Sequence, residues 1–296
     1  MHIRHIGAVP VGAVGLGAMP LSIEGRPDED RAIATIHAAL DAGVTLIDTA
    51  DSYHWHAGEA GHNEELVARV LAARDDAGAV LVATKGGRGR PGDGSWTVDG
   101  SPDHLKRACE ASLRRLGVDT IGLYQLHKPD PAVPWADSVG ALAELLDEGK
   151  IRMAGVSNVD TGQIRQARDL LGDRLASVQN RFSPALRTGE PELRLCEELG
   201  IAFLPWSPLG GISRSSLDGG SRPGAPDPAY AAFHEVAREH GVSPQRVCLA
   251  WLLARSPAVI PIPGASRPET IRDSAAAAGL ALDADELARL ETAGTS

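Results

Sequence analysis

Four side chains suited to carbonyl chemistry follow short apolar runs of the chain. Asp48 and Tyr53 lie in LIDTADSY, Lys85 in VATKGG and His127 in LYQLHKPD. A tyrosine phenol titrates near pH 10, so it is a weak proton donor at neutral pH. A lysine cation beside it favours the phenolate and lowers that pKa, and an aspartate keeps the lysine charged and in position. A neighbouring histidine can donate a hydrogen bond to a carbonyl oxygen. Together the four can polarise a C=O group and protonate the alkoxide after a hydride arrives, without a metal ion.

These residues meet only if the elements before them end at one face of the fold. Short apolar runs without alternation, typical of buried parallel strands, occur at Gly43–Thr49, Ala79–Thr84, Ile121–Leu126, Met153–Ser157, Ser177–Gln179, Ile201–Trp206, Ala258–Ile262 and, weakly, Gly279–Leu282. Helical patterns lie between them, including Asp28–Asp41, Asn63–Arg74, Pro102–Leu116, Trp135–Glu148, Gln163–Leu171 and Glu190–Leu199. Several of these helices are followed by glycine, a common helix C-terminal signal.

Eight strand–helix units in about 250 residues predict a (β/α)8 TIM-type barrel. No linker or change of composition divides the chain, so we expect a single α/β domain over residues 1–296. Residues before Gly17 are expected to form a short hairpin at the bottom of the barrel. Residues 213–228 are rich in Ser, Gly and Pro and are expected to form a mobile loop, either a lid or an inert connection.

The composition narrows the partners and the compartment. The net charge of −10 disfavours nucleic acid and anionic membranes as partners. No apolar run approaches 18 residues and no signal peptide is evident, so we expect a cytoplasmic protein. The three cysteines are scattered and favour reduced, packed thiols. A monomer is the default expectation.

Seven motifs in order, each at an expected strand end, resemble those of the aldo-keto reductases over essentially the whole chain: LIDTADSY, VATKGG, LYQLHKPD, GVSN, SVQN, WSPLGG and PIPGAS. The resemblance implies Tyr53 as general acid, tuned by Lys85 and Asp48, with His127 orienting the carbonyl. It also implies a nicotinamide cofactor across the barrel mouth. Its carboxamide would be held by Ser157, Asn158 and Gln179, its ring stacked on Trp206, its pyrophosphate wrapped by Ser207, Pro208, Leu209, Gly210 and Gly211, and the mouth lined by Gly17, Ala18 and Met19.

The adenosine end of the expected cofactor site departs from the pattern of many family members. Those members carry lysine, serine and a downstream arginine, where this chain has Gly264, Ala265 and Thr270. GASRPETIRDS is more similar to the branch that contains potassium-channel beta subunits and related bacterial-type oxidoreductases, which implies Ser266, Thr270 and Asp273 near the adenosine. Arg267 is the nearby cation able to meet a 2′-phosphate, so we expect NADPH, with NADH as the alternative.

Other motifs carry competing interpretations. Gly87–Gly92 matches GxGxxG, but no helix opens after it, so a loop over the site is favoured over a dinucleotide fingerprint. The histidines in YHWHAGEAGH fit no standard metal spacing. Trp55, Trp96 and Phe182 follow expected strands and are candidates for an apolar substrate pocket, with core or rim packing as the alternative.

Two functions fit these features. The first is a carbonyl reductase acting on a small-molecule aldehyde or ketone. The second is a slow-turnover NADPH-binding redox sensor or regulatory subunit, which the GAS motif suggests. The sequence does not select a substrate.

Overall fold

Parallel strands form most of a closed ring in the computed structural model, which describes residues 2–210 and 230–292. Seven strands are hydrogen-bonded in the order β11-β10-β9-β8-β5-β4-β3. Their bounds are β3 Leu16–Gly17, β4 Leu46–Asp48, β5 Leu81–Gly86, β8 Ile121–Leu126, β9 Ile151–Ser157, β10 Leu175–Gln179 and β11 Ala202–Phe203.

Residues 258–264 close the ring between β11 and β3. Parallel bridges join Phe203 to Val259 and Gly17 to Gly264. Backbone hydrogen bonds from Ile260 N to Phe203 O (2.9 Å) and from Gly17 N to Pro263 O (3.0 Å) extend this pairing. Prolines interrupt the segment and lack the N–H that a regular ladder requires, which explains why the pairing is made of single bridges. The (β/α)8 barrel is thereby confirmed.

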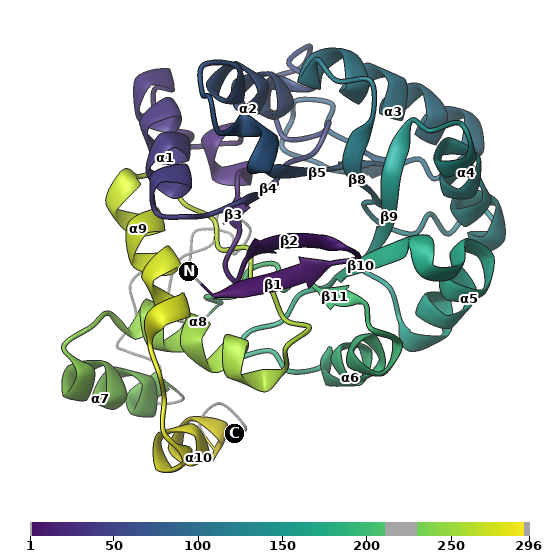
Figure 1. Cartoon of the computed structure of the whole chain (residues 1–296). Coiled ribbons are helices and arrows are strands. Elements are labelled where there is room, and N and C mark those ends of the chain that lie inside the picture. The colour runs from purple at the N-terminus through teal and green to yellow at the C-terminus, as the bar shows by residue number, and fades with distance from the viewer. Residues whose placement is uncertain (1, 211–229, 293–296) are drawn as a thin grey trace.

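Helices form a ring around the barrel (Figure 1). The eight helices of the repeating units are α1 Glu29–Asp41, α2 His62–Ala72, α3 Pro102–Leu116, α4 Trp135–Asp147, α5 Thr161–Leu171, α6 Glu190–Leu199, α8 Pro244–Arg255 and α9 Pro268–Ala276, and two further helices are α7 Ala231–His240 and α10 Ala284–Thr292. Local capping fixes where some begin. The Asp160 side chain accepts from Gln163 N at 2.8 Å, and Gln163 Oε1 accepts from Asp160 N at 3.1 Å, which forms a capping box at the start of α5.

The expected N-terminal hairpin is present and covers the bottom of the barrel (Figure 1). Strands β1 (Ile3–Ile6) and β2 (Val9–Gly12) pair antiparallel. Ile6 and Val11 are buried in the cluster that fills the barrel interior, together with Leu46 and Leu123. The barrel is therefore a packed core that is closed at this end.

The strand expected at Gly279–Leu282 is absent, and this prediction was wrong. Ala277–Gly279 forms a 3-10 helix, and the side chains of Leu280 and Leu282 pack against the hydrophobic core. The remaining strand of the barrel is β3 instead, where only two residues pair regularly with β4. The expected mobile loop at 213–228 lies outside the described residues.

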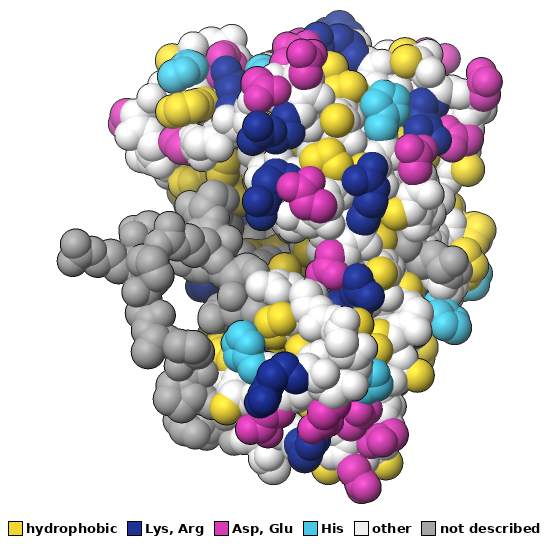
Figure 2. Space-filling view, turned by 90° about the vertical axis from the view of Figure 1, so that its left-hand side faces the viewer, with side chains coloured by type: hydrophobic (Ala, Val, Ile, Leu, Met, Phe, Trp, Pro, Cys, Tyr) yellow, Lys and Arg dark blue, Asp and Glu magenta, His cyan; other side chains and the backbone are white. Residues whose placement is uncertain are grey.

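Acidic and basic side chains are interspersed on the face that Figure 2 shows. Surface ion pairs join them, such as Arg69 with Glu29 at 2.6 Å and Arg289 with Glu239 at 2.6 Å. Among the helices in the described ranges, none has the length and apolar character required to cross a membrane.

Candidate active site

Lys85 is the centre of the expected cluster and is completely buried at the end of β5. Its ammonium group donates three hydrogen bonds: to Asp48 Oδ2 at 2.6 Å, to the Thr49 carbonyl at 2.8 Å and to Tyr53 OH at 3.0 Å. An ammonium has three N–H donors, so every one is satisfied. The three acceptors all come from β4 and the loop that follows it, which the pairing of β4 with β5 brings beside Lys85.

The hydrogen bond from Lys85 fixes the role of the Tyr53 hydroxyl. Because its oxygen accepts from the ammonium, its own proton is left to donate elsewhere. Burial raises the pKa of Tyr53 above its usual value, even though the Lys85 cation acts to lower it. The net lowering expected from the sequence is therefore not observed, and the phenol stays protonated at neutral pH.

At Tyr53 burial outweighs the neighbouring charge, whereas at Lys85 the neighbouring charges outweigh burial. Burial by itself lowers the pKa of this ammonium, but the charges and hydrogen bonds of Asp48 and Tyr53 outweigh it and raise the pKa. Gln179 Nε2 donates to the second carboxylate oxygen of Asp48 at 2.8 Å. Lys85 is thus held charged, and the carboxylate that holds it is itself anchored from β10.

His127 lies beside Tyr53 at the end of β8, with the two rings edge to face at a centroid distance of 5.7 Å. Burial, with the Lys85 and Arg88 cations nearby, lowers its pKa well below the usual value. The imidazole is therefore neutral at physiological pH and has one N–H to donate. Its Nδ1 is buried with no hydrogen-bond partner in the part of the chain that the structure describes.

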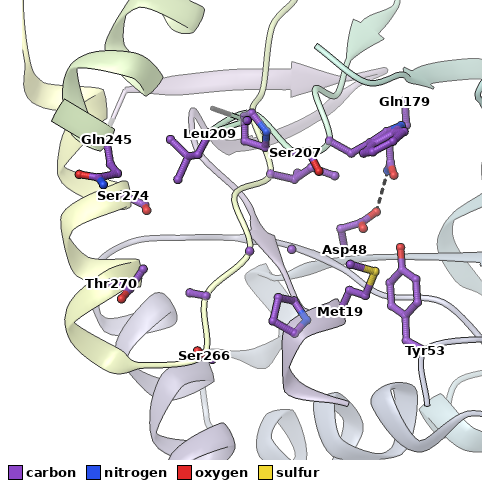
Figure 3. A pocket seen from close by; sticks show the side chains of 18 of the residues that line it. Met19, Asp48, Tyr53, Gln179, Ser207, Leu209, Gln245, Ser266, Thr270 and Ser274 are labelled. Carbon is purple, nitrogen blue, oxygen red and sulfur yellow. Dashed lines mark hydrogen bonds between the residues drawn. The ribbon is translucent and has the colours of Figure 1, made fainter. Parts of the chain in front are cut away.

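A cavity of about 790 Å³ extends from this cluster to α9. Figure 3 shows Tyr53, Asp48 and Gln179 at one end, and Thr270, Ser274 and Gln245 on helices at the other. Most of the residues expected to bind a cofactor line it: Gly17, Met19, Ser157, Asn158, Gln179, Trp206, Ser207, Pro208, Leu209, Gly210, Gly264, Ser266, Arg267, Thr270 and Asp273.

Glycines shape the middle of this cavity. A Cβ on Gly17 would lie 2.7 Å from the Ile262 carbonyl oxygen, and a Cβ on Gly264 would lie 2.8 Å from Pro20 Cγ. Both distances are shorter than a Cβ tolerates, so the close approach of β3 and residues 258–264 depends on glycine at these positions.

The polar residues that follow β9 and β10 form one connected network. Ser157 Oγ donates to the Gln179 carbonyl at 2.6 Å, and Asn158 Nδ2 donates to the His127 carbonyl at 2.9 Å. Asn158 adopts a positive φ of 60°, which few residues other than glycine and asparagine accept. This network ties the expected carboxamide site to the backbone of His127.

Some expected site residues lie elsewhere. Lys85 and Ala18 are fully buried behind the cavity wall, and Trp55 stacks on His56 at a centroid distance of 5.0 Å, outside the cavity. Phe182 is completely buried against Phe203 and Trp251, so it belongs to the core and not to a substrate pocket. Gly211 lies outside the described residues. Trp96 lines the cavity as expected.

Sequence reasoning missed several cavity residues, of which Arg88, Glu24 and Glu269 carry charge. Arg88 lies in the segment that resembles GxGxxG. That segment forms a hairpin of β6 (Arg88–Gly89) and β7 (Thr97–Val98) and no helix, as expected. The two arginines of this segment were the feature of the sequence that could have pointed to a charged cavity wall.

The histidines clustered in YHWHAGEAGH contact neighbouring groups of the protein. His54 Nδ1 contacts the His56 carbonyl, and His62 Nδ1 contacts Ser22 Oγ.

Asp51, in the same loop as Tyr53, carries a strongly perturbed carboxyl group. Burial, then the nearby charge of Glu64, raises its pKa to about 8, while Arg115 acts in the opposite direction. Its Oδ1 is buried without a hydrogen-bond partner among residues 2–210 and 230–292. In the folded state this carboxyl therefore keeps a proton that the unfolded chain releases near pH 4.

The pH dependence of stability follows from that difference. Between about pH 4 and 8 the folded state binds one more proton than the unfolded state, so the free energy of unfolding falls as pH rises. We expect the free energy of unfolding of Asp51→Asn to fall less steeply with pH, by up to about 1.4 kcal/mol per pH unit. Urea unfolding at pH 5, 6 and 7 measures it. Asp119→Asn, at an exposed position, should leave the change of unfolding free energy with pH as it is in the unaltered protein. If Asp51→Asn also showed the same change with pH as the unaltered protein, Asp51 would not be the group that keeps the extra proton.

Comparison with known proteins agrees with this geometry. The model of the aldo/keto reductase family matches residues 13–294. A 6-dehydroglucose reductase of Novosphingobium aromaticivorans is 35% identical over 283 residues, covering 93% of this chain and 88% of the relative. A glycerol dehydrogenase of Gluconobacter oxydans has a TM-score of 0.84 at 31% identity, covering 98% of this chain and 94% of that one. An aldo/keto reductase of Klebsiella pneumoniae, solved with NADP and acetate, has a TM-score of 0.78 at 29% identity, with coverage of 98% and 94%.

Proposed function

The chain belongs to the aldo/keto reductase family, and from that premise we propose that it reduces aldehydes or ketones to alcohols, with NADPH as cofactor and Tyr53 as general acid. The observation that carries the proposal is the buried Lys85 ammonium, whose three donors are all used and whose contact with Tyr53 OH leaves the phenol proton to donate. That phenol faces the cavity that reaches α9 (Figure 3).

The residues of the cavity fit a dinucleotide. Its polar end at Ser157, Asn158 and Gln179 offers amide and hydroxyl groups for a carboxamide, and Trp206 offers a flat aromatic face for a ring. Gly17 and Gly264 line the cavity and have no side chains, which leaves their backbone open to a bound dinucleotide. At the other end, α9 begins at Pro268 and presents the positive end of its dipole to a phosphate.

When bound, NADPH supplies the hydride to the carbonyl carbon. His127, neutral because burial lowers its pKa, donates a hydrogen bond to the carbonyl oxygen. As negative charge develops on that oxygen, Tyr53 transfers its proton to it. Lys85 stabilises the phenolate that results, and Asp48 balances the charge of Lys85. The protein's contribution is therefore a phenol proton on an oxygen that lies 3.0 Å from the fixed Lys85 nitrogen.

The proposal is tested by mixing the purified protein with NADPH and a panel of aromatic and aliphatic aldehydes. Loss of absorbance of the reduced nicotinamide, dependent on the aldehyde, is the expected result. Tight NADPH binding with no turnover of any aldehyde would overturn the reductase assignment and support the slow-turnover sensor instead.

Cofactor preference is expected to depend on Arg267. This residue lines the cavity just before α9, is exposed, and has only a weak 3.8 Å contact with Glu269. Asp273, the other charged residue expected near the adenosine, is already paired with Arg246 at 2.6 Å. We therefore expect Arg267→Ala to raise KM for NADPH about tenfold, with little change for NADH.

A matched control lies on the same helix. Arg272 is also an exposed arginine of α9 but does not line the cavity, so Arg272→Ala should leave both KM values unchanged. An unaltered NADPH/NADH ratio of kcat/KM in Arg267→Ala would show that Arg267 does not read the 2′-phosphate.

A further inference from the structure

Arg88 lies in the wall of the cavity at its Tyr53 end. It belongs to β6, the first strand of the hairpin that follows Lys85, and it lines the cavity together with Trp96, Tyr53 and His127. Its charge acts on both Tyr53 and His127, which places it beside the residues that we assign to proton transfer. Nothing in the proposed reaction uses it.

The Arg88 side chain has no acidic partner among the residues that the structure describes. No ion pair or hydrogen bond joins it to a carboxylate there, and its Nε is buried without a hydrogen-bond partner. Burial, then the like charge of Arg90, lowers its pKa, while the opposing contribution comes from Tyr53. A half-buried guanidinium in this position gains free energy from any anion that reaches it.

Arg90, two residues along the chain in the same hairpin, has the ionic partner that Arg88 lacks, although its own Nε is likewise buried without a hydrogen-bond partner among the described residues. It donates to the His54 carbonyl at 2.7 Å and forms an ion pair with Glu24. Glu24 is an acidic residue of the cavity, and Arg90 already engages it. Asp48 is likewise engaged by Lys85. Within the described ranges, Arg88 is thus the surplus positive charge at this end of the cavity.

An aromatic platform holds the guanidinium in place. Two arginines lie over the Trp96 ring, with Arg88 Cζ at 4.4 Å and Arg90 Cζ at 4.6 Å from its centroid. The same ring contacts His127 edge to face at 6.3 Å. Stacking engages the face of a guanidinium and not its N–H donors, so those donors remain available for two parallel hydrogen bonds to a carboxylate.

We propose that Arg88 is an anion-recognition residue for the substrate, and that the preferred substrates are aldehydes or ketones that carry a carboxylate. This inference rests on the proposed reductase function. The 2′-phosphate of the cofactor is not the anion in question, because Ser266 and Thr270, near which the adenosine is expected, lie at the opposite end of the cavity from Tyr53 (Figure 3).

The test uses two pairs of substrates in which a charged carboxylate is replaced by its neutral methyl ester: 4-carboxybenzaldehyde with methyl 4-formylbenzoate, and 4-oxobutanoate with its methyl ester. We expect the acid to have the higher kcat/KM in at least one pair. Arg88→Gln should lower kcat/KM for that acid about 10- to 100-fold more than for its ester. Any effect of Arg88 on the proton affinity of Tyr53 changes both members of a pair equally, so the ratio isolates recognition of the anion.

Two further variants sharpen the result. Arg88→Lys, which keeps the charge, should recover part of the preference for the acid. Arg152→Gln removes an exposed arginine at the opposite end of β9 from Ser157 and should leave both members unchanged. Equal losses on acid and ester in Arg88→Gln, or no preference for either acid in the unaltered protein, would overturn the inference while leaving the reductase function standing. Failure to reduce all four compounds and the wider aldehyde panel would instead remove the proposed function and this inference with it.

Discussion

Tyr53→Phe is expected to reduce kcat for aldehyde reduction by about 10²- to 10⁴-fold, the range that general acid catalysis contributes. The substitution deletes one oxygen and keeps the ring, which packs edge to face against His127 at 5.7 Å and lies 4.8 Å from Lys85 Nζ. The carbonyl oxygen then loses its proton donor while the surrounding cavity persists. Steady-state rates with NADPH and a reactive aldehyde measure the effect.

Binding of the cofactor separates loss of chemistry from loss of structure. Ser157, Asn158 and Gln179 make their hydrogen bonds without the Tyr53 hydroxyl, so Kd for NADPH should change by less than about threefold in Tyr53→Phe, a difference of about 0.7 kcal/mol. A variant that binds NADPH normally and retains more than a tenth of the kcat would mean that another group, with His127 first among them, supplies the proton.

The barrel was predictable because its strands carry a strong local signal. β8 (Ile121–Leu126) and α3 (Pro102–Leu116) have the same bounds in the sequence and in the structure, since a continuous apolar run and a Ser-Pro helix start require no tertiary information. β3 has only two regularly paired residues, Leu16 and Gly17, and could not be recognised from such a signal. Its pairing depends on neighbours that are distant in the sequence.

The positions of some site residues could likewise be predicted from the sequence, and those of others could not. Asp48 is the last residue of β4, Lys85 is the next to last of β5 and His127 directly follows β8, so their convergence follows from the direction of the strands. Phe182 also follows a strand, yet it turns into the core against Trp251, because side-chain direction in a loop is decided by tertiary packing. Arg88 was overlooked because what distinguishes it is the lack of an acidic partner among the described residues. That lack depends on the tertiary structure and cannot be recognised from the spacing of residues in the sequence.

Lys85→Met is expected to damage both stability and activity, through separate causes. Removing the ammonium leaves Asp48 buried with its Oδ2 uncompensated, and breaking a buried pair from one side costs about 3–5 kcal/mol. Without the cation, the phenolate form of Tyr53 loses its stabilisation, so proton transfer slows and kcat should fall at least about 100-fold. Urea unfolding and steady-state kinetics measure the two effects independently.

The double variant Asp48→Asn/Lys85→Met distinguishes those causes. Asparagine at 48 removes the uncompensated charge while its side-chain oxygen still accepts from Gln179 Nε2, so much of the lost free energy of unfolding should return. Activity should not return, because the cation that donates a hydrogen bond to the Tyr53 oxygen is still missing. If kcat recovered along with stability, the role of Lys85 would be to keep the site folded and not to assist Tyr53. Recovery of stability alone would instead assign the cation a direct part in proton transfer, as its 3.0 Å contact with the phenol implies.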